Sequence, residues 1–398
     1  MLFFCAFRYL GGKNAMLEKD ELTALCALNK VLGYVPAAGH ALLARFGSAA
    51  AVFDRADDAA RRQALGAYRD YADQIGGPLL DWADKELDRL REGGFRFIGF
   101  GEEDYPSLLA ECDDPPLGLY FNASSPPASV FEMRPCVSVV GTRDISPYGR
   151  DWCRRLVRAR GEASGTPGIV SGRAFGADGT AHRTALECGI PTVGVMATGV
   201  EQIYPWQHAE LAGQMVRTPD CAVVTDYPLG SSPVALNFIR RNRIIAGLSR
   251  ATVVIESKTR GGSLITAKYA CDYNRDVYAL PGRRDDPRSA GCNSLIRQRM
   301  ADIITDPEDL VERLGLGKTA RRRKAGLEAL LSRKYGAGSP PVRLALLVKS
   351  HPGVSLEEIV RETGWSWPEV QERAALLETD GFLETDLLRR CTIPAKID

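Results

Sequence analysis

Apolar residues recur at spacings of three and four along the first third of the chain, and the clearest run is Leu22, Leu25, Leu28, Val31 and Leu32. These spacings place side chains on one face of a helix, so the run predicts an amphipathic helix. Pro36 and Gly39 interrupt the stretch 31–48, which resembles a helix-hairpin-helix of the sterile-alpha-motif type. Such a hairpin either offers backbone amides to a phosphate or serves only as a packing module of the domain. We expect residues 17–122 to form a small all-α domain that ends in irregular, proline-rich structure.

The apolar pattern changes after Pro135. Short runs rich in Val, Ile and Ala alternate with helical patterns over about 150 residues, and this alternation predicts an α/β domain with a doubly wound parallel sheet at 130–314. The predicted strands are Val137–Gly141, Gly168–Gly172, Thr192–Ala197, Cys221–Asp226, Ala251–Glu256 and Asp276–Pro281.

Glycine turns follow four of these strands. Ligands of doubly wound sheets bind beyond the carboxyl ends of the strands, so four glycine turns on one rim predict an extended anion-binding surface. The turns contain Gly141, Thr142 and Arg143; Ser171, Gly172, Arg173, Phe175 and Gly176; Gly199 with Trp206 beyond it; and Gly261, Gly262 and Ser263.

The fifth strand has the strongest phosphate-site pattern around it. A basic cluster precedes the strand, and a helical pattern opens after the glycine pair. Free N–H groups and the helix dipole at such a turn attract anions, and Ser263 or Thr266 can add a hydroxyl donor. The same glycine-serine sequence occurs in ordinary strand-to-helix turns, so the turn alone leaves that alternative open. The basic cluster consists of Arg240, Arg241 and Arg243.

Arg143, Asp178 and His182 each have two interpretations. Arg143 directly follows a strand-ending glycine, which favours ligand binding, but it could instead pair with Asp144 or Asp151. Asp178 and His182 lie four residues apart on one helical face. A metal or base role needs more ligands than these two residues provide, so we expect an internal hydrogen bond that fixes the loop.

The last part of the chain has a different character. Residues 315–341 contain seven basic residues between glycines and prolines, which predicts a solvated linker with a short helix that either binds nucleic acid nonspecifically or only stays soluble. Residues 342–398 have the outline of a winged helix. Its expected second and third helices are acidic, and phosphates repel such helices. We therefore expect this domain to make protein contacts or to regulate. The expected helices are Val342–Ser350, Leu356–Thr363 and Pro368–Thr379.

Composition excludes several classes. The 398 residues are 45% hydrophobic and 25% charged, with a net charge of +1. Of the ten cysteines, no two lie closer than seventeen positions, so the sequence has no CxxC zinc spacing. We expect no metal or cofactor. Residues 1–16 are an uncertain N-terminal extension, because Met16 could equally be the start of the protein. The apolar patch within them is too short to span a bilayer. We therefore expect a cytoplasmic protein with no membrane partner.

The motifs resemble the DNA-processing protein A family, also called DprA or Smf. This resemblance implies an extended Rossmann-like domain that binds single-stranded DNA. It also implies a homodimer without established catalytic activity that protects incoming DNA in natural transformation and loads the recombinase RecA. The phosphate pocket of the family falls here on Gly141, Thr142 and Arg143, with Ser171, Gly172 and Gly176 beside it, and on Gly261, Gly262, Ser263 and Thr266. The basic-asparagine-basic block of the family falls on Arg241, Asn242 and Arg243. The matching blocks begin at Val139, Ser171, Thr198, Arg240, Gly261, Arg275 and Gly291.

Two positions depart from the family pattern. Phe175 and Trp206 stand where members usually carry a cation. Either ring could stack on a base or cover the edge of the sheet, and the loss of two cations lowers the expected salt dependence of binding. Arg173 could restore one of the charges.

Two other functions are compatible with the same turns. The chain also resembles phosphoribohydrolases of the lysine-decarboxylase-like type, which cleave nucleoside monophosphates. Those enzymes need a carboxylate at the glycine loop, and Glu256 is the only nearby candidate here. The other alternative is a scaffold whose pocket holds a small nucleotide.

Overall fold

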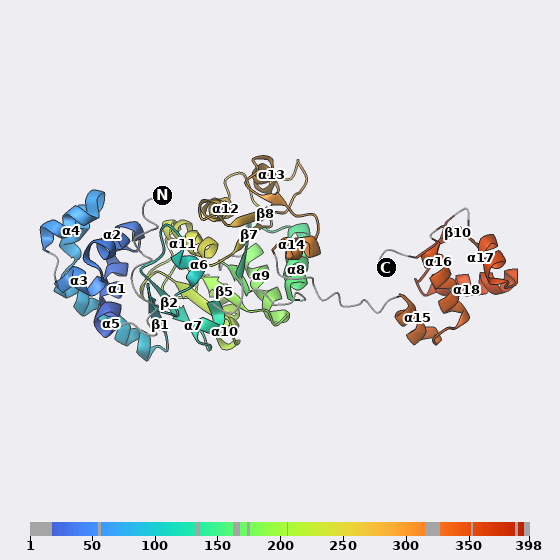
Figure 1. Cartoon of the computed structure of the whole chain (residues 1–398), viewed down its shortest axis with the longest axis horizontal. Helices are drawn as coiled ribbons and strands as arrows, with labels where there is room; N and C mark the ends of the chain where they lie inside the picture. Colours follow the sequence, from blue (N-terminus) through green and yellow to red (C-terminus); the bar gives the residue numbers. More distant parts are fainter. Residues whose placement is uncertain are drawn as a thin grey trace. The chain divides into compact units, whose positions relative to one another are not determined.

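The computed structural model describes residues 18–54, 57–131, 136–161, 168–172, 176–204, 206–314, 327–351, 353–386 and 389–393. The chain divides into two compact units, Met1–Thr319 and Ala320–Asp398 (Figure 1). Each unit has its own core, so each is described by itself.

The first unit opens with a helical region. Local signals set its helix ends: Pro36 occupies the first turn of α2, and Gly47 ends α2 with a φ of 89°. Gly39 does not form the predicted turn. It lies inside α2, where an added Cβ would lie 2.5 Å from Leu117 Cδ1, so close packing requires a glycine there. The elements are α1(Lys19–Leu32), α2(Pro36–Phe46), α3(Ala49–Asp54), α4(Asp58–Leu65), the 3-10 helix η2(Gly66–Gln74) and α5(Gly77–Glu92).

A nine-stranded sheet follows, in the order β1-β2-β6-β5-β4-β3-β7-β8-β9. The seven strands from β3 onward run parallel, while β1 and β2 add an antiparallel edge. The strands are β1(Arg96–Gly99), β2(Gly118–Asn122), β3(Cys136–Val140), β4(Gly168–Ser171), β5(Thr192–Val195), β6(Ala222–Thr225), β7(Ala251–Val254), β8(Asp276–Ala279) and β9(Asp302–Ile303).

The doubly wound sheet confirms the predicted α/β fold, and all six predicted strands occur within two residues of their expected ends. The expectation that the helical domain at 17–122 ends in irregular structure was wrong. Residues 96–99 and 118–122 are β1 and β2, and β2 pairs with β6. These two short strands lie among glycines and prolines, so their pattern resembled a loop.

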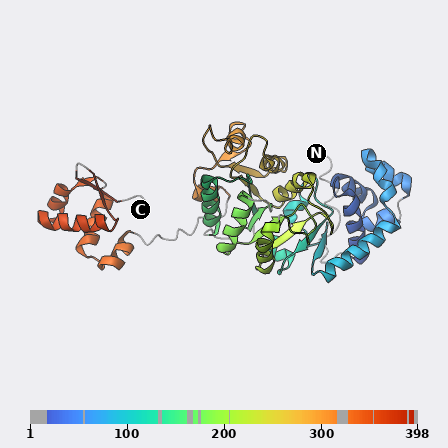
Figure 2. The same ribbon diagram turned by 180° about the vertical axis from the view of Figure 1, so that it is seen from behind.

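Helices cover both faces of the parallel strands (Figures 1 and 2). Val137 and Val139 of β3 pack with α8, α9 and α14, whereas Val140 packs with α11, α12 and α13 on the opposite side. This alternation follows from the two-residue period of a strand. The remaining helices of this unit are α6(Ser107–Ala110), α7(Pro127–Phe131), α8(Pro147–Gly161), α9(Ala177–Glu187), η3(Trp206–His208), α10(Ala209–Arg217), α11(Ala235–Gly247), α12(Gly262–Asp272), α13(Ala290–Arg297) and α14(Pro307–Arg313).

The helical region shares a core with the edge of the sheet. Phe97 of β1 and Tyr120 of β2 belong to the same buried cluster as Leu25, Leu28 and Leu32 of α1. Burial of large apolar side chains is the main favourable term in such packing. The helical region is therefore packed against the antiparallel edge of the sheet.

The described residues of the second unit form four helices and a three-stranded sheet of order β10-β12-β11. Its three longest predicted helices are present, and two of them begin with capping boxes in which Glu358 and Glu369 accept from Ser355 and Ser366. The winged-helix assignment stays a prediction. The elements are α15(Leu327–Tyr335), α16(Pro340–Ser350), β10(Val354–Ser355), α17(Leu356–Thr363), α18(Trp367–Thr379), β11(Glu384–Thr385) and β12(Arg390–Thr392).

The predicted linker is shorter than expected. Leu327 and Leu331 of α15 are buried in the core of the second unit, so this part of 315–341 belongs to that unit. Residues 315–326, which hold most of the basic run, and the extension 1–16 lie outside the described residues. Within the described parts of the chain, every helix is too short or too polar to cross a bilayer.

Candidate nucleic-acid interface

The candidate site lies at the carboxyl ends of β3, β4, β5 and β7. The strand order reverses at β3, because β4 follows on one side of it and β7 lies on the other. At this switch point two loops meet: the Thr142 N–H donates to the Glu256 carbonyl oxygen at 2.7 Å. Loops that diverge from such a point leave a crevice for ligands.

Two of the predicted glycines are required by close packing at this point. Gly176 has a φ of 79°, and an added Cβ would lie 2.2 Å from the carbonyl oxygen of Thr142. A Cβ on Gly141 would lie 2.7 Å from Cβ of Ala177, at the start of α9. These glycines bring the loop after β3 onto the N-terminus of α9.

Arg143 is an exposed cation on this rim. Its Cζ lies 5.4 Å from the ring centroid of Phe238, and that ring meets the ring of Tyr204 edge to face at 5.8 Å. The predicted alternative, an ion pair with Asp144, is not formed, because Asp144 binds Arg288 at 3.0 Å. Among the described residues, Arg143 has no carboxylate partner within salt-bridge distance. It is therefore available to an anionic ligand.

The three arginines of α11 lie in different surroundings. Arg240 is half-buried, with its Cζ 4.4 Å from the ring centroid of Tyr34 in the helical region. Arg241 is 4% exposed and donates to the carbonyl oxygen of Val195 at the end of β5. Burial lowers the pKa of Arg241 to about 10, although the carboxylate of Asp178 opposes this shift.

Arg241 lies directly beneath the loop after β4. An added Cβ on Gly172 would lie 2.7 Å from Arg241 Nη2 and 2.5 Å from Asp178 Oδ2. Its Nε is buried and lacks a hydrogen-bond partner in the described structure. Arg241 therefore supports the Gly172 loop from below instead of projecting from the rim.

The prediction that Arg243 grips a phosphate conflicts with its surroundings. Its Nη2 lies 2.7 Å from Asp226 Oδ2, and both side chains are almost fully buried. Its Nη1 donates to the carbonyl oxygen of Asp114. Burial alone would lower the pKa of Arg243, but the carboxylates of Asp226 and Asp114 outweigh it and raise that pKa. Arg243 is therefore a structural ion-pair residue that ties α11 to β6.

The glycine turn at α12 keeps its backbone accessible but not its hydroxyls. Gly262 is exposed at the first turn of α12, whereas Ser263 donates to Ser257 Oγ at 2.9 Å and Thr266 is 1% exposed. A Cβ on Gly261 would lie 2.2 Å from Ser257 Oγ, so this glycine packs against the preceding loop. The expectation of a free hydroxyl donor from Ser263 or Thr266 was wrong.

Other predicted site residues also have internal partners. The Ser171 hydroxyl donates to the carbonyl oxygen of Val139 at 2.6 Å. Asn242 donates to the Gly262 carbonyl oxygen at 3.3 Å and thereby links α11 to α12. Arg173 and Phe175 lie outside the described residues. Trp206 is 75% exposed, so it does not cover the edge of the sheet.

His182 fixes the loop after β4, in agreement with its expected structural role. Its Nε2 bonds the carbonyl oxygen of Gly172 at 2.8 Å, and its Nδ1 bonds Thr192 Oγ1 at 2.7 Å. The described residues contain no group of three or more His, Cys, Asp or Glu side chains placed to hold a metal ion. The site is therefore built from cations, aromatic rings and backbone groups.

The structure adds rim residues that the sequence argument missed. Lys258 and Arg260 are exposed in the loop just before Gly261, so they flank the start of α12. Their position next to the glycine pair could have identified them as rim residues from the sequence. Tyr34 and Phe238 carried no such signal, because only the fold brings Tyr34 to Arg240 and Phe238 to Arg143.

Glu256 is the carboxylate that the phosphoribohydrolase alternative requires, but its contacts are structural. It is 1% exposed and accepts from the Ser146 amide at 2.9 Å and the Ser146 hydroxyl at 2.5 Å. A Cβ on Gly149 would lie 2.5 Å from its Cδ. Glu256 therefore binds the N-terminus of α8, which does not favour the phosphoribohydrolase alternative.

Several known proteins are similar to this chain. The model of the family DNA recombination-mediator protein A matches residues 96–315. Protein Smf of Synechocystis sp. is 39% identical over 229 residues, which is 58% of this chain and 56% of that protein. DNA processing protein DprA of Bacillus subtilis is 34% identical over 228 residues, which is 57% of this chain and 74% of that protein.

A solved structure is also similar. The X-ray structure of DNA processing protein A from Streptococcus pneumoniae superposes with a TM-score of 0.57 at 30% identity, covering 74% of this chain and 94% of that chain. The match to the Synechocystis protein, by contrast, spans little more than half of that relative's length.

Proposed function

This chain belongs to the DNA recombination-mediator protein A family, and we propose that it binds single-stranded DNA, without regard to sequence, along the carboxyl ends of its central strands. The observation that carries the proposal is Arg143. It is an exposed guanidinium at the switch point of the sheet, held beside an aromatic ring and free of a carboxylate partner among the described residues. Phosphates carry no base information, so binding through them is independent of sequence.

The backbone of the strand would be held by cations from three segments. Arg143 follows β3, Arg240 lies on α11, and Lys258 and Arg260 precede α12. The N-terminus of α12 adds free amides and the positive end of the helix dipole at Gly262. An arginine guanidinium presents several donors in a planar fork that matches phosphate geometry. These groups supply charge and direction without a metal ion.

Aromatic side chains beside the cations favour an unpaired strand over a duplex. Trp206 is 75% exposed, and Tyr34 and Tyr204 are each 45% exposed. Stacking of a free base on such a ring contributes about 1 to 3 kcal/mol, and it is open only to bases that are not already stacked within a duplex. The rim therefore combines phosphate contacts with platforms for unpaired bases.

The wider role follows from family membership. We propose a cytoplasmic homodimer that protects incoming DNA during natural transformation and helps load RecA, with the acidic helices α17 and α18 of the second unit making protein contacts. The mass of the protein in solution, measured by light scattering, tests the dimer. Recovery of purified RecA on immobilised protein, with and without single-stranded DNA, tests the partner.

We propose a binding protein and not a nucleotide-processing enzyme. The support is the position of Glu256, whose carboxylate is buried against Ser146. Incubation of the protein with nucleoside monophosphates should release no free base. Release of base that disappears in a Glu256→Gln variant would reverse the choice.

A gel shift with single-stranded and duplex oligonucleotides across a salt series tests the binding proposal. Arg143→Ala should weaken single-strand binding about tenfold or more, because a charge-assisted hydrogen bond is lost. It should also reduce the slope of log affinity against log salt by about 0.7, the value for one phosphate contact on a single strand.

Arg217→Ala is the matched control. Arg217 is an exposed arginine at the C-terminal end of α10, just before β6, and therefore lies toward the amino ends of the parallel strands, away from the rim. This variant should bind as the wild type does. Equal affinity for single strand and duplex, or full binding by Arg143→Ala, would refute the proposal.

A further inference from the structure

Helix α8 carries a line of arginines on its exposed face. Its sequence, residues 147–161, holds five arginines and one acidic residue, although the whole chain is almost neutral, with 51 basic and 50 acidic residues. Arg150, Arg154 and Arg158 are exposed, and their spacing of four residues places them in a line along the helix. Each lies about 6 Å further along the axis than the one before, so the line is about 12 Å long.

A fourth exposed arginine lies on the neighbouring helix. Because α8 and α9 each follow a strand of the parallel sheet, they run in the same direction, and they pack against each other (Figure 1). Arg158 Nη2 lies 3.9 Å from Glu187 Oε2 of α9, and Arg154 and Arg183 each come four residues before a member of this pair. Arg183 therefore lies beside Arg154, at the same level along the two helices. We call Arg150, Arg154, Arg158 and Arg183 the α8–α9 basic face.

Most of the basic face lacks a counter-charge. Of its four arginines, only Arg158 has a carboxylate within salt-bridge distance among the described residues, and this pair with Glu187 is too exposed to contribute much. Like charges four residues apart, such as Arg150 and Arg154, destabilise a helix. Positive charge that is clustered, exposed and not neutralised by the protein itself is typical of a surface that binds a polyanion.

The basic face begins next to the rim. Helix α8 starts at Pro147, four residues after Arg143. Glu256, at the end of β7, holds this start in place by accepting from the Ser146 amide at 2.9 Å. Arg150 lies only about 5 Å along the helix axis from the first residue of α8. The positive charge of the rim therefore continues onto the outer surface of α8 and α9.

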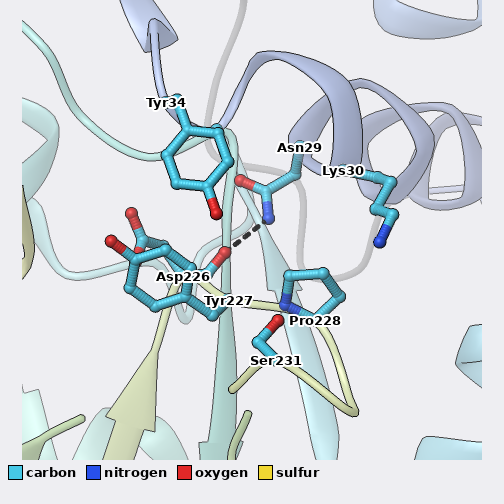
Figure 3. Close-up of a pocket in the computed structure, with 8 residues that line it drawn as sticks. Asn29, Lys30, Tyr34, Asp226, Tyr227, Pro228 and Ser231 are labelled. Carbon is cyan, nitrogen blue, oxygen red and sulfur yellow. Dashed lines mark hydrogen bonds between the residues drawn. The ribbon is translucent and has the colours of Figure 1, made fainter. Parts of the chain in front are cut away.

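The helical region closes the rim beside β6. Asn29 of α1 donates to the Asp226 carbonyl oxygen at 2.9 Å, as the dashed line in Figure 3 shows, and the rings of Tyr34 and Tyr227 lie next to this bond. The cavity at this junction has a volume of about 70 Å³, whereas sites for small molecules measure about 300 Å³ or more. A nucleotide does not fit there, so a strand that continues beyond the rim has its room over α8 and α9.

We infer that single-stranded DNA continues from the rim along the α8–α9 basic face, with its phosphates on Arg150, Arg154 and Arg183. The inference rests on the proposed function, because it extends the path of the same strand. A stacked strand advances about 3.4 Å per nucleotide, so about four phosphates accompany the line of arginines on α8. These contacts carry no base information. Long strands therefore bind more tightly than strands that cover only the rim.

The test compares two lengths of oligo-dT. The rim crosses β5, β4, β3 and β7, a width of about 14 Å, so a strand of about 6 nucleotides covers it, while one of about 30 also reaches α8. The double variant Arg150→Gln, Arg154→Gln should bind the short strand as the wild type does. It should bind the long strand about tenfold less tightly, and its salt slope on that strand should fall by about 1.4, the value for two phosphate contacts. Fluorescence anisotropy across a salt series measures both quantities.

The matched control is the double variant Arg155→Gln, Arg217→Gln, which removes the same amount of charge. Arg155 is next to Arg154 in the sequence but points about 100° away around the helix, and its Cζ lies 4.5 Å from the ring centroid of Trp152. All four substituted arginines are exposed, so both double variants should fold. The control should bind both strands as the wild type does. An equal loss in the control would show that net charge, and not the basic face, determines binding, and would overturn the inference.

The rim variant separates this inference from the proposed function. If Arg143→Ala loses the short strand while Arg150→Gln, Arg154→Gln keeps full affinity for the long strand, the rim binds DNA but the strand does not follow α8. That result would overturn the inference and leave the basic face to an acidic protein partner. Failure of the wild type to bind either strand would instead refute the proposed function, and the inference with it.

Discussion

The two halves of helix α11 carry arginines into opposite surroundings. In the first half, Leu236 is 49% exposed and Arg240 covers the ring of Tyr34. In the second half, Arg241 and Arg243 are almost fully buried. The first half can therefore meet a ligand, whereas the second half holds the sheet, the Gly172 loop and the segment around Asp114 together.

This difference shows that the sequence of a basic motif does not indicate which of its charged side chains are available to a ligand. Arg240 and Arg243 are three residues apart and lie near one face of the helix. Asp114 and Asp226 nevertheless cover only the second of them. A count of arginines thus overestimates the binding charge of this helix.

Removal of Arg243 should have the largest effect on stability. Arg243→Met leaves the buried carboxylate of Asp226 without its counter-charge, which typically costs about 3 to 5 kcal/mol in free energy of unfolding. Urea denaturation measures the loss. Arg240→Met, in the exposed half of the helix, should unfold near the wild-type midpoint. A loss of equal size in both variants would remove the distinction between the two halves.

The stability of Arg243→Met should also depend on pH in a defined direction. Burial raises the pKa of Asp226, and loss of Arg243 raises it further above the unfolded value of about 3.9. Between these two pKa values the folded state binds the extra proton, so folding gains stability as the pH falls.

The difference between this variant and the wild type should therefore shrink from pH 7 to pH 5, by at most about 1.4 kcal/mol per pH unit. Urea midpoints at both pH values check this shift. A difference that stays constant or grows on acidification would show that Asp226 does not carry the uncompensated charge.

Substitution of Gly172 tests how Arg241 supports the rim. Gly172→Ala places a methyl group 2.7 Å from Arg241 Nη2 and 2.5 Å from Asp178 Oδ2, and such overpacking costs about 1 to 3 kcal/mol. Gly262→Ala is the control, because no atom lies within 4 Å of its added Cβ, and its stability should change by less than about 0.5 kcal/mol. Thermal unfolding of both variants decides whether the Gly172 loop is as tightly packed as the distances indicate.

The smallest effect should come from Arg240, the half-exposed arginine. Arg240→Ala should weaken single-strand binding a few-fold and lower the salt slope by about 0.7, the value for one phosphate contact. Its unfolding curve should match the wild type, and Arg217→Ala should change neither property. An unchanged salt slope would show that Arg240 makes no phosphate contact and that its role is to hold Tyr34.

Several parts of the site were predictable and others were not. The glycine turns at Gly141 and Gly176 could be predicted because each comes after a predicted strand. The structure shows that the backbone at both glycines packs too closely against neighbouring atoms to leave room for a side chain. Arg143 is exposed beside the ring of Phe238, and its contact with a ligand stays a prediction. The hydroxyls of Ser171 and Ser263 were misjudged, because their partners, Val139 and Ser257, were not evident from local sequence.

The alternation of short apolar runs with helical patterns was by itself enough to determine the parallel sheet and the rim on which its loops gather. This prediction was possible because the spacing of apolar residues within each strand or helix indicates which of its faces is buried. Only the tertiary structure decided that Arg243 is neutralised by Asp226 and that Tyr34 lies against Arg240. Each of these facts depends on contacts between residues more than fifteen, and up to about two hundred, positions apart, and no local pattern encodes them.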